Sequence, residues 1–239
     1  MMNNCDQCVV RNKSICAALD PDELVAINRL SRKVSIKAGQ ALIWEGDDSL
    51  IVANVVEGAF KLTSSLEDGR EQIIGLLYPS DFVGRPFGDK NEYSVTALAD
   101  SKVCVFSRSD FDQFVREHPD LEHKLLRRTL IELDRVRRSM LLLGRKTAAE
   151  RVASFLLEMS ERLADASCSV VGGNLKLFAL PFGRQQVADI LGLTIETVSR
   201  QMTQLKKNDI IALPDHRNVQ ILDADRLRNI ADAGALSVH

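Results

Sequence analysis

Three cysteines stand within the first sixteen residues of the chain, MMNNCDQCVVRNKSIC. Cys5, Cys8 and Cys16 lie in a polar stretch with no apolar run that would bury their thiols in a core. No basic stretch followed by an apolar one precedes them, so we expect no secretion signal and a reducing, cytoplasmic environment. Cysteines clustered in such an environment are more often metal ligands or redox groups than parts of disulfides.

The composition limits the class of protein. With 239 residues, 45% of them apolar and 27% charged, the chain has the profile of a globular protein of one large or two ordinary domains. No window approaches about eighteen consecutive apolar residues, so we expect no membrane span. The net charge of −2 does not by itself indicate a nucleic-acid partner, although binding depends on local patches. The motifs of common enzymes are missing and the four histidines are scattered, so we expect no enzyme.

Short apolar segments separated by turns fill residues 34–108. Their glycines fall at intervals typical of antiparallel strands: Gly39, Gly46, Gly58, Gly69 and Gly84. Asp68 before Gly69 predicts a tight hairpin. We therefore expect a β-sandwich or jelly roll of about eight strands, preceded by a short helix over 19–30. Its last strand, 103–107, carries Cys104.

Residues 109–143 have the pattern of one long helix, with Pro119 as a candidate break. An a/d seam runs along it, with apolar or small residues recurring every seven positions: Leu126, Thr129, Leu133, Val136, Met140 and Leu143. The seam predicts a homodimer held by two such helices. The alternative is a helix that packs on its own β-domain.

The stretch 184–208 divides into a helix, a turn at Gly192 and a second helix that Thr194 can cap. This is the helix-turn-helix layout, whose second helix enters the major groove of DNA. The following segment, IIALPDHRNVQIL, has the pattern of a β-wing. The candidate DNA contacts are one residue at the start of the first helix, Arg184, and five at the start of the second: Thr194, Glu196, Thr197, Ser199 and Arg200.

Two of these side chains can read base edges. Arg200 can bond both acceptors of a guanine, and Glu196 can accept from cytosine N4. The alternative is an ordinary surface pair, because Glu196 and Arg200 are four residues apart on one helix.

From about residue 19 to 228 the chain resembles the CRP/FNR family of bacterial transcription regulators. KAGQALIWEGD and PSDFVG resemble its β-roll, and LTIETVSRQMTQLKKNDII resembles its recognition helix. The E-T-V-S-R stretch and LLLGRKTAAERVASFLLEMSERL resemble the FNR branch. The resemblance implies that Glu196, Ser199 and Arg200 read a TTGAT-type inverted repeat in double-stranded DNA. It also implies that the loop 79–89 touches RNA polymerase, although such a loop needs no partner to explain it.

The resemblance also implies a cofactor. Oxygen-sensing FNR regulators hold a [4Fe–4S] cluster on four cysteines, and the matching residues here are Cys5, Cys8, Cys16 and Cys104. That cluster supports the DNA-binding dimer and is lost to oxygen. A zinc site on the same thiols is one alternative. An iron–sulfur electron-transfer protein is another, and Cys104 as a merely buried strand residue is a third. Cys168 matches none of these sites and is treated as a bystander.

Two positions depart from family patterns. Cyclic-nucleotide activators place a Glu after the roll glycine and an Arg before a Ser, whereas here Arg85 follows Gly84 and Tyr93 precedes Ser94. The missing arginine removes the bidentate phosphate partner, which argues against a cyclic-nucleotide effector. Some FNR regulators carry an Asp that opposes dimerisation where this chain has Val136. An apolar residue there predicts that dimerisation depends less on the cluster.

We therefore expect an α+β protein in four parts. These are a cysteine-rich segment over 1–18, a β-roll sensor domain over 19–108, a dimerisation helix over 109–144 and a winged helix-turn-helix domain over 145–239.

Overall fold

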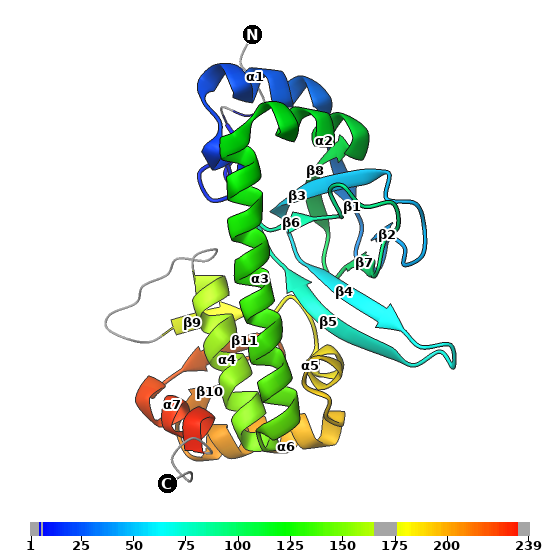
Figure 1. Cartoon of the computed structure of the whole chain (residues 1–239). Coiled ribbons are helices and arrows are strands. Elements are labelled where there is room, and N and C mark those ends of the chain that lie inside the picture. Colours follow the sequence, from blue (N-terminus) through cyan, green and yellow to red (C-terminus); the bar gives the residue numbers. More distant parts are fainter. Residues whose placement is uncertain (1–4, 6, 165–175, 234–239) are drawn as a thin grey trace, which may run out of the picture. The chain divides into compact units, whose positions relative to one another are not determined.

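The structure is a computed structural model that describes residues 5, 7–164 and 176–233 (Figure 1). It divides into two compact units, residues 1–135 and 136–239, with the boundary inside the long helix. Cys168 lies outside the described residues. In the parts of the chain that the structure describes, no helix combines the length and the apolar character that crossing a membrane requires.

The first unit is a β-roll with helices before and after it. Its elements are η1 Ile15–Ala18, α1 Pro21–Leu30, β1 Ser31–Ile36, β2 Ala41–Ile43, β3 Ile51–Glu57, β4 Phe60–Ser65, β5 Glu71–Leu77, β6 Phe82–Val83, β7 Ser94–Ala97, β8 Ser101–Ser107, α2 Arg108–Glu117 and the start of α3 Pro119–Arg145. The strands form two antiparallel sheets, β1-β8-β3-β6 and β2-β7-β4-β5. The predicted eight-stranded roll is confirmed.

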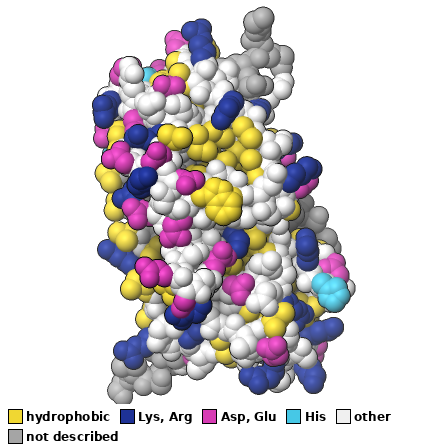
Figure 2. Space-filling model, turned by 90° about the vertical axis from the view of Figure 1, so that its right-hand side faces the viewer, with side chains coloured by type: hydrophobic (Ala, Val, Ile, Leu, Met, Phe, Trp, Pro, Cys, Tyr) yellow, Lys and Arg dark blue, Asp and Glu magenta, His cyan; other side chains and the backbone are white. Residues whose placement is uncertain are grey.

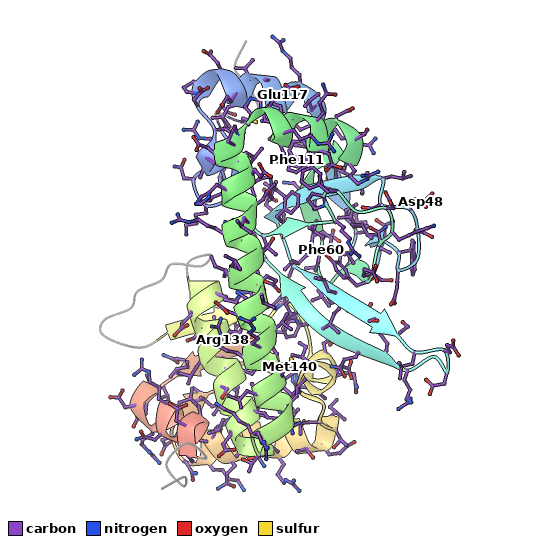
Figure 3. The ribbon with its side chains drawn as sticks, in the orientation of Figure 1. Asp48, Phe60, Phe111, Glu117, Arg138 and Met140 are labelled. Atoms are coloured by element: carbon purple, nitrogen blue, oxygen red, sulfur yellow. The ribbon has the colours of Figure 1, made fainter. Side chains whose placement is uncertain are left out.

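The sheet β1-β8-β3-β6 is covered on both faces, because side chains alternate along each strand. On β8, Val103 and Val105 point into the core between the sheets, beside Phe60. Phe106 points the other way, into a second core that includes Phe111 of α2 (Figure 3). Cys104 packs against this second core, on the outer face of the sheet.

The helix boundaries follow from local chemistry. Asp20 caps α1 by accepting from the amides of Asp22 and Glu23, and the Glu23 carboxylate accepts in return from the Asp20 amide at 2.8 Å. The predicted break near Pro119 is confirmed, since α2 ends at Glu117 and α3 begins at Pro119.

The second unit carries the winged helix-turn-helix. Besides the end of α3, it contains α4 Ala148–Ala164, β9 Lys176–Ala179, α5 Arg184–Leu191, α6 Ile195–Lys207, β10 Ile211–Ala212, β11 Asn218–Ile221 and α7 Ala224–Asp232. The three strands form one sheet in the order β10-β11-β9. Gly192 makes the turn between α5 and α6 with φ 59° and ψ 42°, a left-handed conformation that glycine adopts without strain.

Candidate functional site

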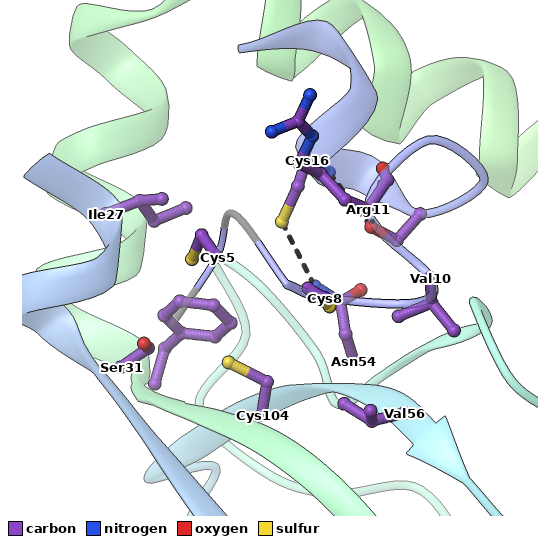
Figure 4. Close-up of a pocket in the computed structure, with 12 residues that line it drawn as sticks. Cys5, Cys8, Val10, Arg11, Cys16, Ile27, Ser31, Asn54, Val56 and Cys104 are labelled. Carbon is purple, nitrogen blue, oxygen red and sulfur yellow. Dashed lines mark hydrogen bonds between the residues drawn. The ribbon is translucent and has the colours of Figure 1, made fainter. Parts of the chain in front are cut away.

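The four predicted ligand cysteines meet at one place in the first unit. Cys5, Cys8, Cys16 and Cys104 all line a single small cavity of about 20 Å³ on the outer face of the roll. Figure 4 shows the sulfur atoms of Cys5, Cys16 and Cys104 facing the same space. Residues almost a hundred positions apart in the sequence are thus brought together.

The N-terminal cysteine segment, residues 5–16, is anchored by its own apolar residues. Ile15 is completely buried in the core beneath α1 and α2, and Val10 is 6% exposed. Successive turns shape the segment, with the Cys8 amide donating to the Cys5 carbonyl at 3.2 Å. The segment is therefore packed more firmly than its polar composition indicated.

Cys5, Cys16 and Cys104 are positioned by different elements. Cys5 Sγ donates to Asn28 Oδ1 of α1 at 3.3 Å. The backbone amide of Cys16, in η1, donates to Ser14 Oγ at 3.3 Å. Cys104 lies on β8 between Lys33 of β1 and Asn54 of β3, its partners in the two ladders.

Burial keeps the inner thiols neutral in this state. It raises the pKa of Cys16 to about 12, and it also raises the pKa of Cys104. The other cysteines of the site push the Cys16 pKa in the same direction, because four thiolates would repel one another. A group that binds the thiolates must therefore displace protons, so its binding strengthens as the pH rises.

The donor set fits a thiophilic metal group, while the space does not yet accommodate one. Four soft sulfur donors around one cavity suit an iron–sulfur cluster or zinc. The cavity has room for about one water molecule, so a larger group needs the segment 5–16 to move outward. Within the described ranges, no three Cys, His, Asp or Glu side chains stand close enough together to hold one ion.

An unpredicted contact joins the cysteine segment to α3. The Arg128 guanidinium donates to the backbone carbonyl of Lys13, between Cys8 and Cys16. The same guanidinium lies 3.6 Å from the Asp81 carboxylate of the roll. Arg135, two turns further along α3, lies 3.9 Å from the same carboxylate. Sequence patterns gave no signal for Arg128, which resembled any other charged residue of the helix surface.

The predicted seam residues of α3 are exposed in the single chain. Leu121 is the one fully buried side chain of this 27-residue helix. Met140 is 70% exposed and Leu126 is 56% exposed, and Leu133, Val136 and Leu143 are also exposed apolar residues (Figure 3). Leu130, Ile131 and Leu141 are further exposed apolar residues of α3, on other faces of the helix. A row of this length without a partner marks an interaction surface.

The candidate DNA contacts lie at the start of α6. Thr194 caps the helix by accepting from the Thr197 amide at 3.3 Å. Glu196 and Arg200 are exposed, and Ser199 is half-buried. Hydrogen bonds from its own amide and from the Thr194 hydroxyl lower the pKa of Glu196, so it is ionised at neutral pH. Among the residues that the structure describes, Glu196 and Arg200 form no ion pair with each other, although they are four residues apart on one helix.

Arg184 and the predicted wing are the other parts of the second unit that bear on DNA contact. Arg184 is half-buried at the first position of α5. The tip of the wing between β10 and β11 is held by Asp215, which accepts from the amides of Arg217 and Asn218 at 2.8 Å each. Hydrogen bonds to its carboxylate lower the pKa of Asp215 to about 2, and the bond from the Asn218 backbone amide has the largest effect.

The loop 79–89 presents an ordered aromatic residue. Phe87 is 50% exposed, and its amide donates to the Asp112 carboxylate of α2 at 3.1 Å. The guanidinium of Arg116 lies 5.8 Å from the centre of the Phe87 ring. Figure 2 shows further hydrophobic side chains gathered in the upper part of the face that it presents.

A larger cavity of about 530 Å³ lies within the first unit, between the roll and the start of α3. Arg85 and Tyr93, the two departures from the cyclic-nucleotide pattern, both line it. Arg85 Nη1 pairs with Glu92 Oε1 at 2.5 Å. Burial raises the pKa of Tyr93, so its hydroxyl is neutral.

A β-roll followed by a long helix and a winged helix-turn-helix defines a class of DNA-binding regulators. Residues 33–118 match the family model described as a cyclic nucleotide-binding domain, and residues 150–230 match a Crp-like helix-turn-helix domain.

Relatives place the chain within this class. It is 44% identical over 227 residues to the transcriptional activator protein FnrL of Cereibacter sphaeroides, covering 95% of this chain and 91% of that protein. It is 37% identical to the nitrogen fixation regulation protein FixK of Bradyrhizobium diazoefficiens, covering 96% and 94%. The chain belongs to the CRP/FNR family and is a DNA-binding transcription regulator of FNR/FixK type, not an enzyme.

Solved structures agree with the fold. FixK2 from Bradyrhizobium japonicum is 35% identical, with a TM-score of 0.76 over 84% of this chain and 96% of that one. A CooA mutant from Carboxydothermus hydrogenoformans has a TM-score of 0.74 at 19% identity, covering 92% of this chain and 96% of that one, and shares the fold alone.

Proposed function

We propose that the chain is an oxygen-responsive transcriptional activator of the cytoplasm. In this proposal Cys5, Cys8, Cys16 and Cys104 hold a [4Fe–4S] cluster, which favours a homodimer. The dimer binds a TTGAT-type inverted repeat in double-stranded DNA and controls genes for low-oxygen metabolism. The observation that carries the proposal is the meeting of all four cysteines at one cavity in a chain of FNR/FixK type.

Reactivity towards oxygen is the chemistry that such a cluster supplies when it is bound. Cys5, Cys8 and Cys16 give up their protons to bind as thiolates, and ligation ties the segment 5–16 to Cys104 on the roll. Metal-binding energy then becomes folding energy for this segment. Without ligation, the segment is held mainly by the buried side chains of Val10 and Ile15.

The contact between Arg128 and the Lys13 carbonyl supports a direct link from the cysteine segment to the dimer helix. A shift of residues 5–16 would remove this acceptor from Arg128 and leave it with Asp81, which it already contacts. The orientation of Arg128 on α3 thus depends on the state of the segment. A switch requires two sites and one structural element whose conformational equilibrium both sites shift. Here the two sites are the cysteine site and the dimer surface, and we assign the role of the shared element to α3.

The exposed apolar row on α3 supports association with a second copy through Leu126, Thr129, Leu133, Val136, Met140 and Leu143. A two-fold dimer would present two recognition helices to successive major grooves, as an inverted repeat requires. Because Val136 is apolar, we expect the metal-free chain to keep some tendency to dimerise.

On DNA, we assign base reading to Glu196, Ser199 and Arg200 of α6. We assign further DNA contacts to Arg184 at the start of α5 and to Thr194 and Thr197 at the start of α6. Phe87 and the loop 79–89 are proposed to contact RNA polymerase, since Phe87 is exposed and held in place by Asp112. We propose that no cyclic nucleotide is the effector, because Arg85 is already paired with Glu92.

The test of the proposed function is anaerobic purification, followed by an absorption spectrum and by iron and sulfide analysis before and after exposure to air. We expect a brown protein with about four irons per chain that bleaches in air. DNA affinity for a TTGAT duplex should fall together with the colour.

Two results would contradict parts of the proposal. A colourless protein that holds zinc and binds TTGAT duplexes equally well with and without air would contradict oxygen sensing. The proposal that the chain is a DNA-binding regulator would then still stand. A brown protein that binds no such duplex would instead favour an electron-transfer role.

A further inference from the structure

Asn54 is a polar side chain in an apolar strand. It lies in the run IVANVV on β3 and is 2% exposed. Its Oδ1 is buried and has no hydrogen-bond partner among the residues that the structure describes. Burying an amide without satisfying its oxygen costs free energy, and a leucine of similar size would avoid that cost. The stability of the roll therefore does not explain why an amide stands here.

The place of Asn54 in the sheet supplies the explanation. Asn54 is the direct ladder partner of Cys104 on β8. Residues directly opposite in an antiparallel pair project to the same face, so both side chains stand on the outer face of the roll. Asn54 also lines the cavity that the four cysteines share.

The same amide reaches the N-terminal half of the cysteine set. Asn54 Nδ2 donates to Cys16 Sγ at 3.8 Å, which is drawn as a dashed line in Figure 4. One side chain on a rigid strand thus lies beside Cys104 and bonds Cys16. It is one point at which the roll and the segment 5–16 meet through polar atoms.

An amide in this position suits thiolates better than thiols. An N–H donor stabilises an anionic sulfur more strongly than a neutral one. In the thiol state the bond to Cys16 is long and the Asn54 oxygen is unsatisfied, so the side chain contributes little. Once Cys16 binds as a thiolate, the same N–H group faces a full negative charge.

We infer that Asn54 is a positioning residue of the cysteine site, whose N–H group holds the Cys16 sulfur beside Cys104. The inference rests on the proposed function for the identity of the group that the cysteines bind, but not for the position of Asn54 between them. Hydrogen bonds to sulfur tune the reduction potential of iron–sulfur groups. Because a donor favours the more negative, reduced state, Asn54 raises that potential.

The test compares the wild-type chain with Asn54→Leu, which removes the donor, and Asn54→Asp, which keeps the shape but places a carboxylate beside the thiolates. Thr63→Val is the matched control, because Thr63 is also 2% exposed in the roll but lies on β4 and does not line the cysteine cavity. Urea unfolding of each metal-free chain should show Asn54→Leu to be at least as stable as wild type.

The first binding probe is Co²⁺, added without oxygen to the metal-free chains and followed by thiolate-to-cobalt absorption. We expect Asn54→Leu to bind Co²⁺ about tenfold more weakly than wild type, and Asn54→Asp more weakly still. Thr63→Val should match wild type. In the iron-loaded chains, spectroelectrochemistry should give a lower reduction potential for Asn54→Leu, together with faster bleaching in air.

The outcomes separate the two ideas. If wild type builds no cluster, but Asn54→Leu weakens Co²⁺ binding, the role of Asn54 stands and the proposed function falls. If wild type builds the cluster, but Asn54→Leu and Asn54→Asp match it in Co²⁺ affinity and potential, Asn54 has no such role. If wild type binds neither Co²⁺ nor a cluster, both ideas fall.

Discussion

The recognition helix α6 takes its candidate DNA contacts from the stretch 194–200, whereas the cysteine site joins Cys5 to Cys104. The geometry of the α6 contacts is set locally, by one capped helix and one glycine turn. The cysteine site exists only when the β-roll has formed and the segment 5–16 has packed on its outer face. A surface built from one helix is insensitive to substitutions elsewhere in the fold, whereas the cysteine site depends on the packing of several elements. We therefore expect substitutions at the cysteine site to have wide effects and substitutions on α6 to have narrow ones.

The largest expected effect is that of Cys104→Ser. Removing the one ligand on the roll should abolish cluster assembly, so that iron falls from about four per chain to well below one after anaerobic reconstitution. Affinity for a TTGAT duplex should then fall to that of the air-exposed protein. Cys168→Ser is the control and should keep its iron. A Cys104→Ser protein with full iron and sulfide would show that this strand cysteine is only a packing residue.

Val136→Asp tests whether α3 carries the signal between the two regions. A carboxylate in the apolar seam should weaken the metal-free dimer by at least tenfold, because burying two like charges at the interface is costly. Sedimentation velocity at micromolar concentration measures the change, with Val136→Leu as the conservative control. If wild-type apo-protein already runs as a strict monomer, our expectation that Val136 weakens cluster dependence is wrong.

Arg200→Ala should have a narrow effect. Losing a bidentate contact should cost about 1–3 kcal/mol of binding at one G·C pair and relax the preference there. Fluorescence anisotropy with duplexes varied at single positions, at constant salt, makes the measurement. Lys207→Ala, at the far end of α6, is the control, and we expect no change in sequence preference. Equal weakening on every duplex would mark Arg200 as a phosphate contact.

Arg128→Ala should have the smallest effect of the four variants. It tests directly whether the cysteine site acts on α3 through the contact with the Lys13 carbonyl. Without its contact to the Lys13 carbonyl, the dimerisation constants of cluster-loaded and metal-free protein should move closer together, by about 0.5–2 kcal/mol. Arg127→Ala is the neighbouring control on an exposed face of the same helix. Unchanged coupling in Arg128→Ala would mean that the signal reaches α3 by another route.

Sequence patterns predicted the local parts of this molecule well. Glycine spacing gave the eight-stranded roll, Pro119 gave the break between α2 and α3, and the seven-residue repeat gave the exposed row on α3. These signals work because each depends on residues close together in the chain. The family resemblance that groups Cys104 with the N-terminal cysteines is consistent with the shared cavity, while metal binding itself stays a prediction.

The residues that link distant parts could not be predicted in the same way. Asn54 acquires its place from the register of β3 against β8, which no local pattern fixes. Its one sequence signal is that it is the polar residue within IVANVV. Arg128 acquires its partner from the packing of the cysteine segment on the roll and α3. Both contacts are properties of tertiary structure.

The Arg128 contact also affects which sequence changes the molecule tolerates. Its acceptor is the main-chain carbonyl of Lys13, not a side chain. Every amino acid supplies that carbonyl, so the residue at position 13 can vary without removing the acceptor, provided that the backbone keeps its path. The contact therefore constrains the amino-acid type at position 128 alone, and not at position 13. A lineage could remodel the surface of the cysteine segment freely while the signal to α3 is preserved.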